Sequence, residues 1–119
     1  MPEHFPTIAA PRPVPGHAFV YILQSADGAL YIGQTVNVAE RLRKHRYGLG
    51  SKFTLDHAQP RLVFHEGPMS PETAVSREAQ LKRWSRAKKE ALIRGDLDLL
   101  STLGRSREHT TLQTSKSKA

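Results

Sequence analysis

The feature that most constrains the fold of this chain is a pair of short apolar segments separated by a turn sequence. Residues 18–23 (AFVYIL) and residues 29–34 (ALYIGQ) are rich in strand-forming residues, and Ser25-Ala26-Asp27-Gly28 separates them. Asp-Gly pairs favour tight turns, whereas apolar and aromatic runs of this length favour strands. The pattern therefore predicts a β-hairpin.

The register of the hairpin decides where its two tyrosines lie. A two-residue Asp-Gly loop would place Tyr21 and Tyr31 on opposite faces of the sheet. A three-residue loop with Gly28 in the left-handed conformation would instead pair Tyr21 with Gly33 and Tyr31 with Leu23, so that both hydroxyl groups share one face. We predict the three-residue loop.

The rest of the chain predicts helices packed on this hairpin and on one further strand. Asn37 with Glu40 three residues later is typical of a capped helix N-terminus. Ser70-Pro71-Glu72 is a second one, because a hydroxyl cap, a proline and an acid suit the first turn. We expect an α/β fold with a small three-stranded, mainly antiparallel sheet flanked by helices, in the order β-β-α-β-α-α. The later elements are expected to be a helix from 37 to about 47, a strand at 61–65, a helix from 70 to about 86 and a helix at 87–94.

The two ends of the chain differ in composition from its centre. Residues 1–16 hold five of the eight prolines and show no strand or helix period, which predicts a disordered or extended arm. Residues 104–119 are polar and basic and predict a flexible tail. Residues 17–103 are then the expected globular domain.

Charge indicates the kind of partner, and missing residue types exclude several kinds of site. Eighteen Lys and Arg against eleven Asp and Glu give a formal charge of +7, which favours a polyanion such as nucleic acid. There are no cysteines, so disulfides and thiolate zinc sites are excluded, and the six histidines lack zinc-binding spacing. No segment is apolar enough to span or be exported across a membrane, so we expect a cytoplasmic protein.

Two groups of residues on predicted helices are candidates for chemistry beside the tyrosines. Arg41 and His45 lie four residues apart, so both can reach one anion. Glu78 falls in the middle of an apolar stripe formed by Ala74, Val75, Leu81 and Ser85, where a carboxylate needs a cation or donors. Each group alone is more typical of ordinary structure: a solvated basic face, a boundary glutamate, and strand tyrosines that pack.

Taken together, these residues resemble the GIY-YIG nuclease superfamily. The second family motif is intact as Tyr31-Ile32-Gly33, and Phe19-Val20-Tyr21 stands at the first. Residues 33–35 followed by Arg41 and His45, and the segment at 48–54 (GLGSKFT), are also similar to family segments. The resemblance covers residues 17–95. Where the family often has an asparagine after its metal-binding glutamate, this chain has Lys88, Lys89 and Arg94.

The resemblance implies a role for each site residue. Glu78 matches the metal ligand, which would hold one Mg²⁺ or Mn²⁺ ion with several waters. Tyr21 matches the general base for the attacking water, and Tyr31 would support that proton transfer. Arg41 would stabilise charge on the phosphate, and His45 would contact the phosphate or assist a proton.

Our leading hypothesis is a metal-dependent endonuclease that hydrolyses phosphodiester bonds of DNA. Recognition would follow DNA structure (nicks, branches or single strands) or a targeting protein partner, because phosphate contacts carry no sequence information; RNA is a second substrate to test. The alternatives are a nucleic-acid-binding protein of this fold with little or no cleavage, and a non-enzymatic interaction protein that uses its basic tails. The lysines expected to contact nucleic acid are Lys44, Lys52, Lys82, Lys88 and Lys89.

Overall fold

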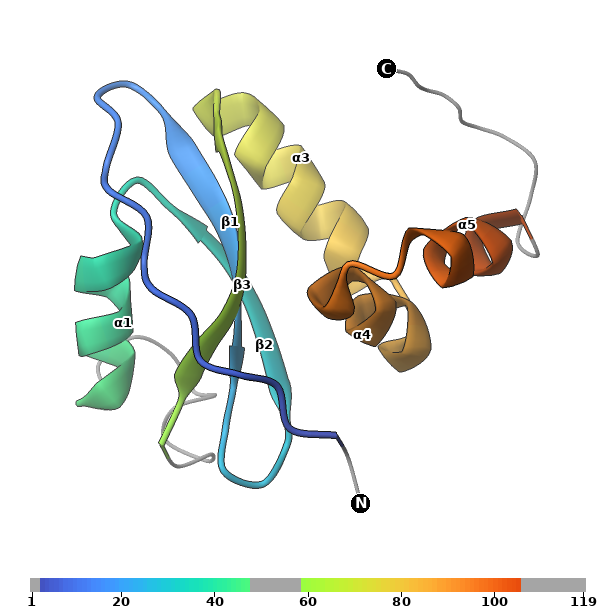
Figure 1. The fold of residues 1–119 in the computed structure, drawn as a ribbon. Coiled ribbons are helices and arrows are strands. Elements are labelled where there is room, and N and C mark those ends of the chain that lie inside the picture. Colours follow the sequence, from blue (N-terminus) through green and yellow to red (C-terminus); the bar gives the residue numbers. More distant parts are fainter. Residues whose placement is uncertain (1–2, 48–58, 106–119) are drawn as a thin grey trace. The chain divides into compact units, whose positions relative to one another are not determined.

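The computed structural model of this protein describes residues 3–47 and 59–105. These residues form two compact units, which we describe separately: residues 3–83 hold the sheet with two helices, and residues 84–105 hold two more helices. The fold class predicted from the sequence is confirmed (Figure 1). The elements are β1 (Ala18–Gln24), β2 (Leu30–Thr35), α1 (Val38–Arg46), β3 (Arg61–Met69), α3 (Pro71–Lys82), α4 (Arg86–Arg94) and α5 (Leu97–Arg105).

The three strands form an antiparallel sheet in the order β2-β1-β3. In the hairpin, Tyr21 pairs with Gly33 and Leu23 pairs with Tyr31. The Gly28 N–H donates to the Ser25 carbonyl over 2.9 Å, and Gly28 has a φ of 91°. The three-residue loop and its register are therefore confirmed, and both tyrosines lie on the same face of the sheet.

Helices α1 and α3 lie on either side of the sheet (Figure 1). The face toward α1 carries a buried cluster to which the central strand β1, the edge strand β3 and the helix contribute. Burial of each such side chain stabilises the fold by about 1.5–3 kcal/mol, so this cluster fixes α1 against β1. Its members are Phe19, Tyr21, Leu23, Val38 and Leu62, with Leu42 and Tyr31 packed at its margin.

Capping side chains determine where the helices begin. The start of α1 is where the sequence predicted it, but the end of α3 is not. The Asn37 side chain accepts from the Glu40 N–H over 3.0 Å, as expected. The helix after Ser70, however, ends at Lys82 rather than near residue 86. The reason is Ser85, whose side chain accepts from the Lys88 N–H over 3.2 Å and begins α4 instead of extending α3.

Helix α5 was not predicted from the sequence. Asp96 caps it by accepting from the Leu99 N–H over 3.0 Å, and the helix runs into the segment predicted to be a flexible tail. Residues 106–119 of that tail lie outside the described residues. In the described part of the chain, no helix is long and apolar enough to cross a membrane.

Strand β3 is longer than the predicted strand at 61–65 and continues through Gly67 and Pro68 to Met69. Glycine and proline usually end a strand, but β3 lies at the edge of the sheet, where both are tolerated. Gly67 has a φ of 140°, and a Cβ atom there would lie 2.8 Å from the Phe19 ring. The glycine is therefore needed for the strand to pass this close to β1.

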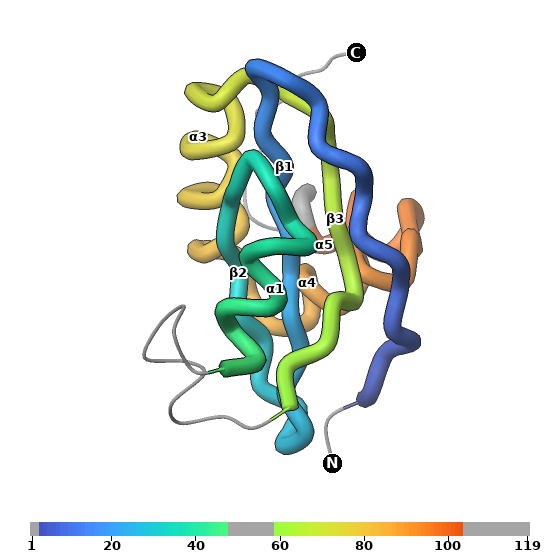
Figure 2. Tube along the Cα trace, turned by 90° about the vertical axis from the view of Figure 1, so that its left-hand side faces the viewer, coloured from blue at the N-terminus to red at the C-terminus, as the bar shows by residue number. Residues whose placement is uncertain are grey.

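The proline-rich segment was predicted to be a disordered or extended arm. In the structure, residues 3–16 form an extended segment. Figure 2 shows this segment running beside β3. Phe5 is 3% exposed, and its carbonyl accepts from the Arg61 guanidinium over 2.9 Å. The Ile8 N–H donates to the Leu62 carbonyl over 2.9 Å, and Val14 packs against the buried cluster. The arm is thus part of the first unit, because Phe5 is buried there and Val14 packs on the cluster.

Candidate functional site

Tyr21 and His45 form a buried pair at the centre of the face toward α1. Tyr21 comes from the middle of β1 and is 0% exposed, and His45 comes from the last turn of α1 and is 1% exposed. The Tyr21 hydroxyl and His45 Nε2 are 3.1 Å apart, which is hydrogen-bonding distance. The register of the hairpin and the 3.6-residue period of α1 bring these two side chains together although they are 24 residues apart.

Tyr31 and Arg41 complete this cluster on its less buried side. The Tyr31 ring lies 4.9 Å from the His45 ring and 6.2 Å from the Tyr21 ring, measured between centroids. Tyr31 and Arg41 are both half-buried, whereas Tyr21 and His45 are closed to solvent. Four of the five predicted site residues therefore form one cluster, which we call the tyrosine cluster: Tyr21, Tyr31, Arg41 and His45.

Gly33 makes room for this arrangement, a role that the sequence analysis did not find. The Tyr21 ring lies across β2 at Gly33, its partner in the register. A Cβ atom at Gly33 would lie 2.5 Å from the Tyr21 hydroxyl oxygen and 2.7 Å from Cζ. Any other residue would push the hydroxyl away from its present position. The signal was present in the predicted register, which already placed Gly33 opposite Tyr21.

The surroundings of Tyr21 act on its proton in opposite directions. Burial raises the pKa of the Tyr21 hydroxyl well above its ordinary value, and the neighbouring Tyr31 raises this pKa further. The Arg41 guanidinium lowers the same pKa through its positive charge and through a hydrogen bond. Of the groups that act on this pKa, Arg41 is therefore the one that favours the phenolate.

His45 is held neutral in this cluster. Burial lowers the pKa of its imidazole, and the positive charge of Arg41 lowers it further. Its Nε2 atom faces Tyr21, while Nδ1 is buried and has no hydrogen-bond partner among the described residues. Because the ring is 1% exposed, an anion in solvent does not reach it in this conformation. The resemblance implied a phosphate contact or a proton role for His45, and this burial argues against a direct phosphate contact in this conformation.

Glu78 lies on α3, which packs on β2 and β1, and the described contacts do not join it to the tyrosine cluster. Its carboxylate pairs with Lys82 over 3.0 Å, and its side chain is 20% exposed. The stripe around it differs from the one predicted: Ala74 and Leu81 are buried, but Val75 is 54% exposed. Ser85 is no part of that stripe because it begins α4. The half-buried position of Glu78 between Ala74 and Leu81 agrees with the prediction.

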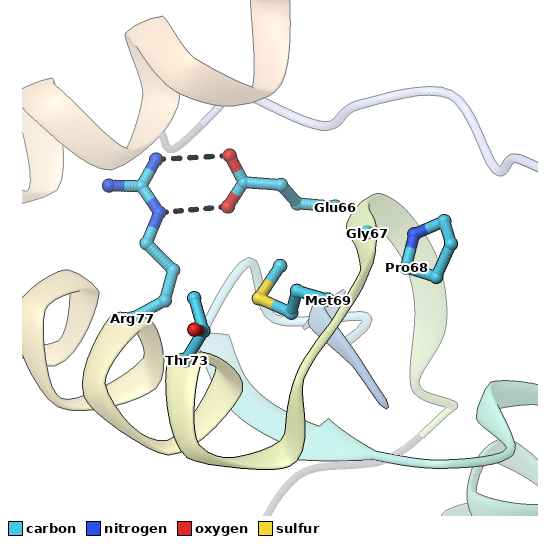
Figure 3. A pocket seen from close by; sticks show the side chains of 6 residues that line it. All are labelled: Glu66, Gly67, Pro68, Met69, Thr73 and Arg77. Atoms are coloured by element: carbon cyan, nitrogen blue, oxygen red, sulfur yellow. Dashed lines mark hydrogen bonds and ion pairs between the residues drawn. The ribbon is translucent and has the colours of Figure 1, made fainter. Parts of the chain in front are cut away.

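Arg77, the residue before Glu78, fixes α3 to the end of β3. Its guanidinium donates from Nε to one oxygen of Glu66 over 2.8 Å and from Nη2 to the other over 3.3 Å, as Figure 3 shows. The pair borders a cavity of about 320 Å³ that Met69 and Thr73 also line. The sequence analysis missed this pair, although Arg77 lies three residues after Ala74 on the buried stripe. A bidentate Arg–carboxylate contact is strong and has a defined geometry. It therefore fixes the position of the helical turn that carries Glu78.

The five lysines predicted to contact nucleic acid have different surroundings. Lys44 is exposed on α1, and Lys82 is exposed and paired with Glu78. Lys88 lies 4.2 Å above the half-buried Trp84 ring, within the second unit. Lys89 is half-buried, and burial and then Arg86 lower the pKa of its amine. Lys52 lies outside the described residues.

The chemistry available in the described residues is acid–base and anion-binding chemistry rather than a preformed metal cage. Within residues 3–47 and 59–105, no three His, Asp or Glu side chains gather closely enough to hold a metal ion. Two phenols, an imidazole and a guanidinium can move protons and contact a phosphate. A metal ion held here would need water for most of its ligands, as Mg²⁺ commonly has.

The sequence of the chain is similar to that of a known protein family. The family model described as the GIY-YIG catalytic domain matches residues 17–91. A UPF0213 protein of Streptococcus pneumoniae is 38% identical over 81 residues, which cover 68% of this chain and 82% of that protein. A UPF0213 protein of Natronomonas pharaonis is 43% identical over 75 residues, covering 63% of this chain and 88% of that one.

A solved structure is also similar in sequence. It is the solution NMR structure of a UPF0213 protein from Bacillus halodurans, 40% identical, with a TM-score of 0.43, covering 65% of this chain and 82% of that one. The family match includes both strands of the hairpin, α1 and α3. The chain therefore belongs to the GIY-YIG family and, within it, to the small UPF0213 proteins.

Proposed function

We propose that this protein is a metal-dependent endonuclease that hydrolyses phosphodiester bonds of DNA. The observation that carries the proposal is the tyrosine cluster, in which a guanidinium lies beside two phenols and a neutral imidazole. The family match and the charge of +7 support a nucleic-acid substrate. Glu78, on the helix packed on β2 and β1, is the proposed metal ligand.

Arg41 and Tyr31 are the residues of the cluster that meet the phosphate. Both are half-buried, whereas Tyr21 and His45 are closed to solvent. Arg41 binds a non-bridging phosphate oxygen and stabilises the charge that develops there, and loss of such a donor costs on the order of 10²–10³ in rate. The attacking water enters the cluster beside these two side chains.

Tyr21 acts as the general base for that water. Its hydroxyl first loses its proton through Tyr31 to solvent, and Arg41 favours the resulting phenolate. The phenolate takes one proton from the water while the water oxygen bonds to phosphorus, and the bond from phosphorus to the leaving oxygen breaks. Tyr21 is protonated again by this step, and the leaving oxygen takes a proton from solvent, which balances the proton that Tyr21 first released.

Glu78 suits a hard divalent cation with water ligands. Its carboxylate is 20% exposed, and its described partner is the exposed Lys82, which can turn away. An oxygen ligand with this access to water fits Mg²⁺ or Mn²⁺, which retain several waters. When bound, the ion would supply Lewis-acid stabilisation of charge on the phosphate and leaving oxygen.

DNA structure or a targeting partner, rather than base sequence, selects the substrate in this proposal. Arg41 of the cluster and Lys44, which is exposed on the same helix, are suited to phosphate, and phosphate contacts carry no sequence information. Nicked, branched and single-stranded DNA are therefore the substrates to compare, with RNA of the same sequences alongside.

The test is cleavage of supercoiled plasmid, labelled branched DNA and matching RNA at low salt with Mg²⁺ or Mn²⁺. Wild type, Glu78→Ala and Tyr21→Phe are compared with Tyr47→Phe as a matched control, because Tyr47 is 77% exposed and outside the cluster. We expect metal-dependent cutting of DNA that Glu78→Ala and Tyr21→Phe lose and Tyr47→Phe keeps. Cutting that survives Glu78→Ala would contradict the proposed site.

The second candidate function is nucleic-acid binding without cleavage. Two observations favour it: Tyr21 is 0% exposed, and Glu78 is paired with a lysine. Under this alternative the wild type binds the same DNAs and cuts none of them with any metal. The cleavage assay, accompanied by a binding measurement on the same samples, separates the two functions.

A further inference from the structure

The hydrogen bond between Tyr21 and His45 has a direction that the surroundings of the two side chains determine. Tyr21 carries one hydrogen on its oxygen, and neutral His45 carries one hydrogen on one of its two ring nitrogens. The distance of 3.1 Å between the hydroxyl oxygen and Nε2 is compatible with either direction. Three observations on the neighbouring groups distinguish them.

The first observation concerns Nδ1, the ring nitrogen of His45 that does not face Tyr21. Nδ1 is buried and has no partner among the described residues, in a side chain that is 1% exposed. If the ring hydrogen were on Nδ1, a buried N–H donor would be left without an acceptor. If it is on Nε2, the unpaired group is a lone pair. Buried N–H groups without acceptors are rarer in proteins than under-satisfied acceptors, which favours the hydrogen on Nε2.

The second observation is where the Tyr21 hydrogen goes. The hydrogen bond with Tyr31 raises the pKa of Tyr21, as expected when Tyr21 donates to Tyr31. The hydrogen bond with Arg41 lowers the same pKa, because a guanidinium only donates. Tyr21 therefore has a second possible acceptor in the Tyr31 oxygen, so its single hydrogen keeps a partner when His45 is the donor.

The third observation concerns charge. If His45 accepted the Tyr21 proton, an imidazolium would form in a buried position beside the Arg41 guanidinium. Both the burial and the charge of Arg41 oppose that cation. His45 is therefore badly placed to take the Tyr21 proton, and its contact with Tyr21 is a hydrogen bond without proton transfer.

We propose that His45 is held as the Nε2–H tautomer and donates to the Tyr21 oxygen. In this arrangement the Tyr21 oxygen receives hydrogen bonds from His45 and Arg41 and sends its own hydrogen to Tyr31. His45 is then a positioning residue that favours the Tyr21 phenolate, and the proton leaves on the Tyr31 side. The assignment of the tautomer rests on the buried Nδ1 and on the groups around Tyr21, while its consequence for catalysis rests on the proposed nuclease function.

The tautomer is measured by long-range proton–nitrogen NMR on the uniformly ¹⁵N-labelled, full-length protein without nucleic acid at neutral pH. The ring signals of His45 are assigned among the six histidines by their loss in His45→Gln. A bare ring nitrogen resonates far downfield of a protonated one, so the two tautomers give distinct patterns. We expect the proton on Nε2 and a bare Nδ1. A protonated Nδ1 with a bare Nε2 overturns the proposal, whether or not the protein cleaves DNA.

The role in catalysis is tested by two replacements of His45. In His45→Gln the side-chain amide offers an N–H close to the position of Nε2, whereas His45→Leu offers none. With folding of both variants confirmed by circular dichroism, we expect His45→Gln to keep cleavage within about tenfold of wild type and His45→Leu to lose about 10²-fold or more. Equal loss in two folded variants overturns the donor role. A wild type that does not cleave refutes the proposed function and leaves the NMR result to decide the tautomer.

Discussion

Replacement of Gly33 by alanine is expected to displace Tyr21 without altering any group that takes part in chemistry. The new Cβ would lie 2.5 Å from the Tyr21 hydroxyl oxygen, 2.7 Å from Cζ and 3.0 Å from Cε1, whereas an ordinary contact begins at 3.4 Å. The hydroxyl therefore has to move by about 0.9 Å. A buried ring in a close-packed cluster makes that movement only at a cost.

The expected cost has two parts. Overpacking a core typically destabilises a protein by about 1–3 kcal/mol, and loss of the hydrogen bond with His45 adds about 0.5–1.5 kcal/mol. Displacement of a catalytic group by about 1 Å can reduce the rate by about 10²-fold. We therefore expect Gly33→Ala to lose about 1.5–4.5 kcal/mol of unfolding free energy and about 10²-fold in cleavage rate.

Chemical denaturation and single-turnover cleavage, measured on the same preparation, test this expectation. Gly16→Ala is the matched control: Gly16 has a φ of 78°, so alanine is strained there, but no atom lies within 4 Å of the added Cβ. The control should lose about 1–2 kcal/mol through the left-handed backbone and keep its cleavage rate. Wild-type stability and rate in Gly33→Ala would refute the close approach of Tyr21 to Gly33.

Three further predictions concern the arm, the imidazole and the basic face. Phe5→Ala should reduce the free energy of unfolding by about 3–5 kcal/mol, because Phe5 is 3% exposed in the packed arm. Denaturant titrations measure this change, and a loss below about 1 kcal/mol would contradict that packing. His45 has a lowered pKa when folded and about 6.5 when unfolded, so the unfolded state binds more protons and stability falls as the pH drops below about 6.5, by up to about 1.4 kcal/mol per unit. That fall should be shallower in His45→Gln, and an unchanged pH profile would argue against a buried neutral ring. Lys44→Ala should weaken DNA binding and reduce the salt slope by about one, as measured by binding at several salt concentrations; an unchanged slope would remove Lys44 from the interface.

The parts of the fold that followed from the sequence are those with strong local signals. The Asp-Gly pair preceding residue 29 required a left-handed glycine, and that single conformation set the register of both tyrosines. Asn37 and Ser70 are good N-caps, so the starts of α1 and α3 were predicted correctly. Arg41 and His45 were placed on one face by the helical period, and both belong to the tyrosine cluster.

The parts that did not follow depend on contacts between distant residues. The arm is ordered because Arg61, 56 residues away, donates to the Phe5 carbonyl and because Phe5 is buried. Composition alone predicted a disordered or extended arm and gave no sign of the contacts that order it. The ion pair of Arg77 with Glu66, and the burial of His45 Nδ1 without a partner among the described residues, likewise depend on packing between elements. Local propensity carries no information on such contacts, so the sequence left them undetermined.

The central claim is that one carboxylate on α3 is required for cleavage and dispensable for binding. Its most direct test is Glu78→Gln, which keeps the size and hydrogen-bonding capacity of the side chain and removes the charge. Glu72→Gln is the matched control, because Glu72 lies on the same helix and is exposed. Single-turnover cleavage and DNA affinity would be measured for both variants beside the wild type.

The account predicts that Glu78→Gln loses cleavage by more than about 10²-fold, since metal-ion stabilisation is worth several kcal/mol. Its affinity for DNA should be equal to that of the wild type or tighter, because a negative charge near the phosphates is removed. Glu72→Gln should cut and bind as the wild type does. Wild-type cleavage by Glu78→Gln, or equal loss in the two variants, would contradict the account.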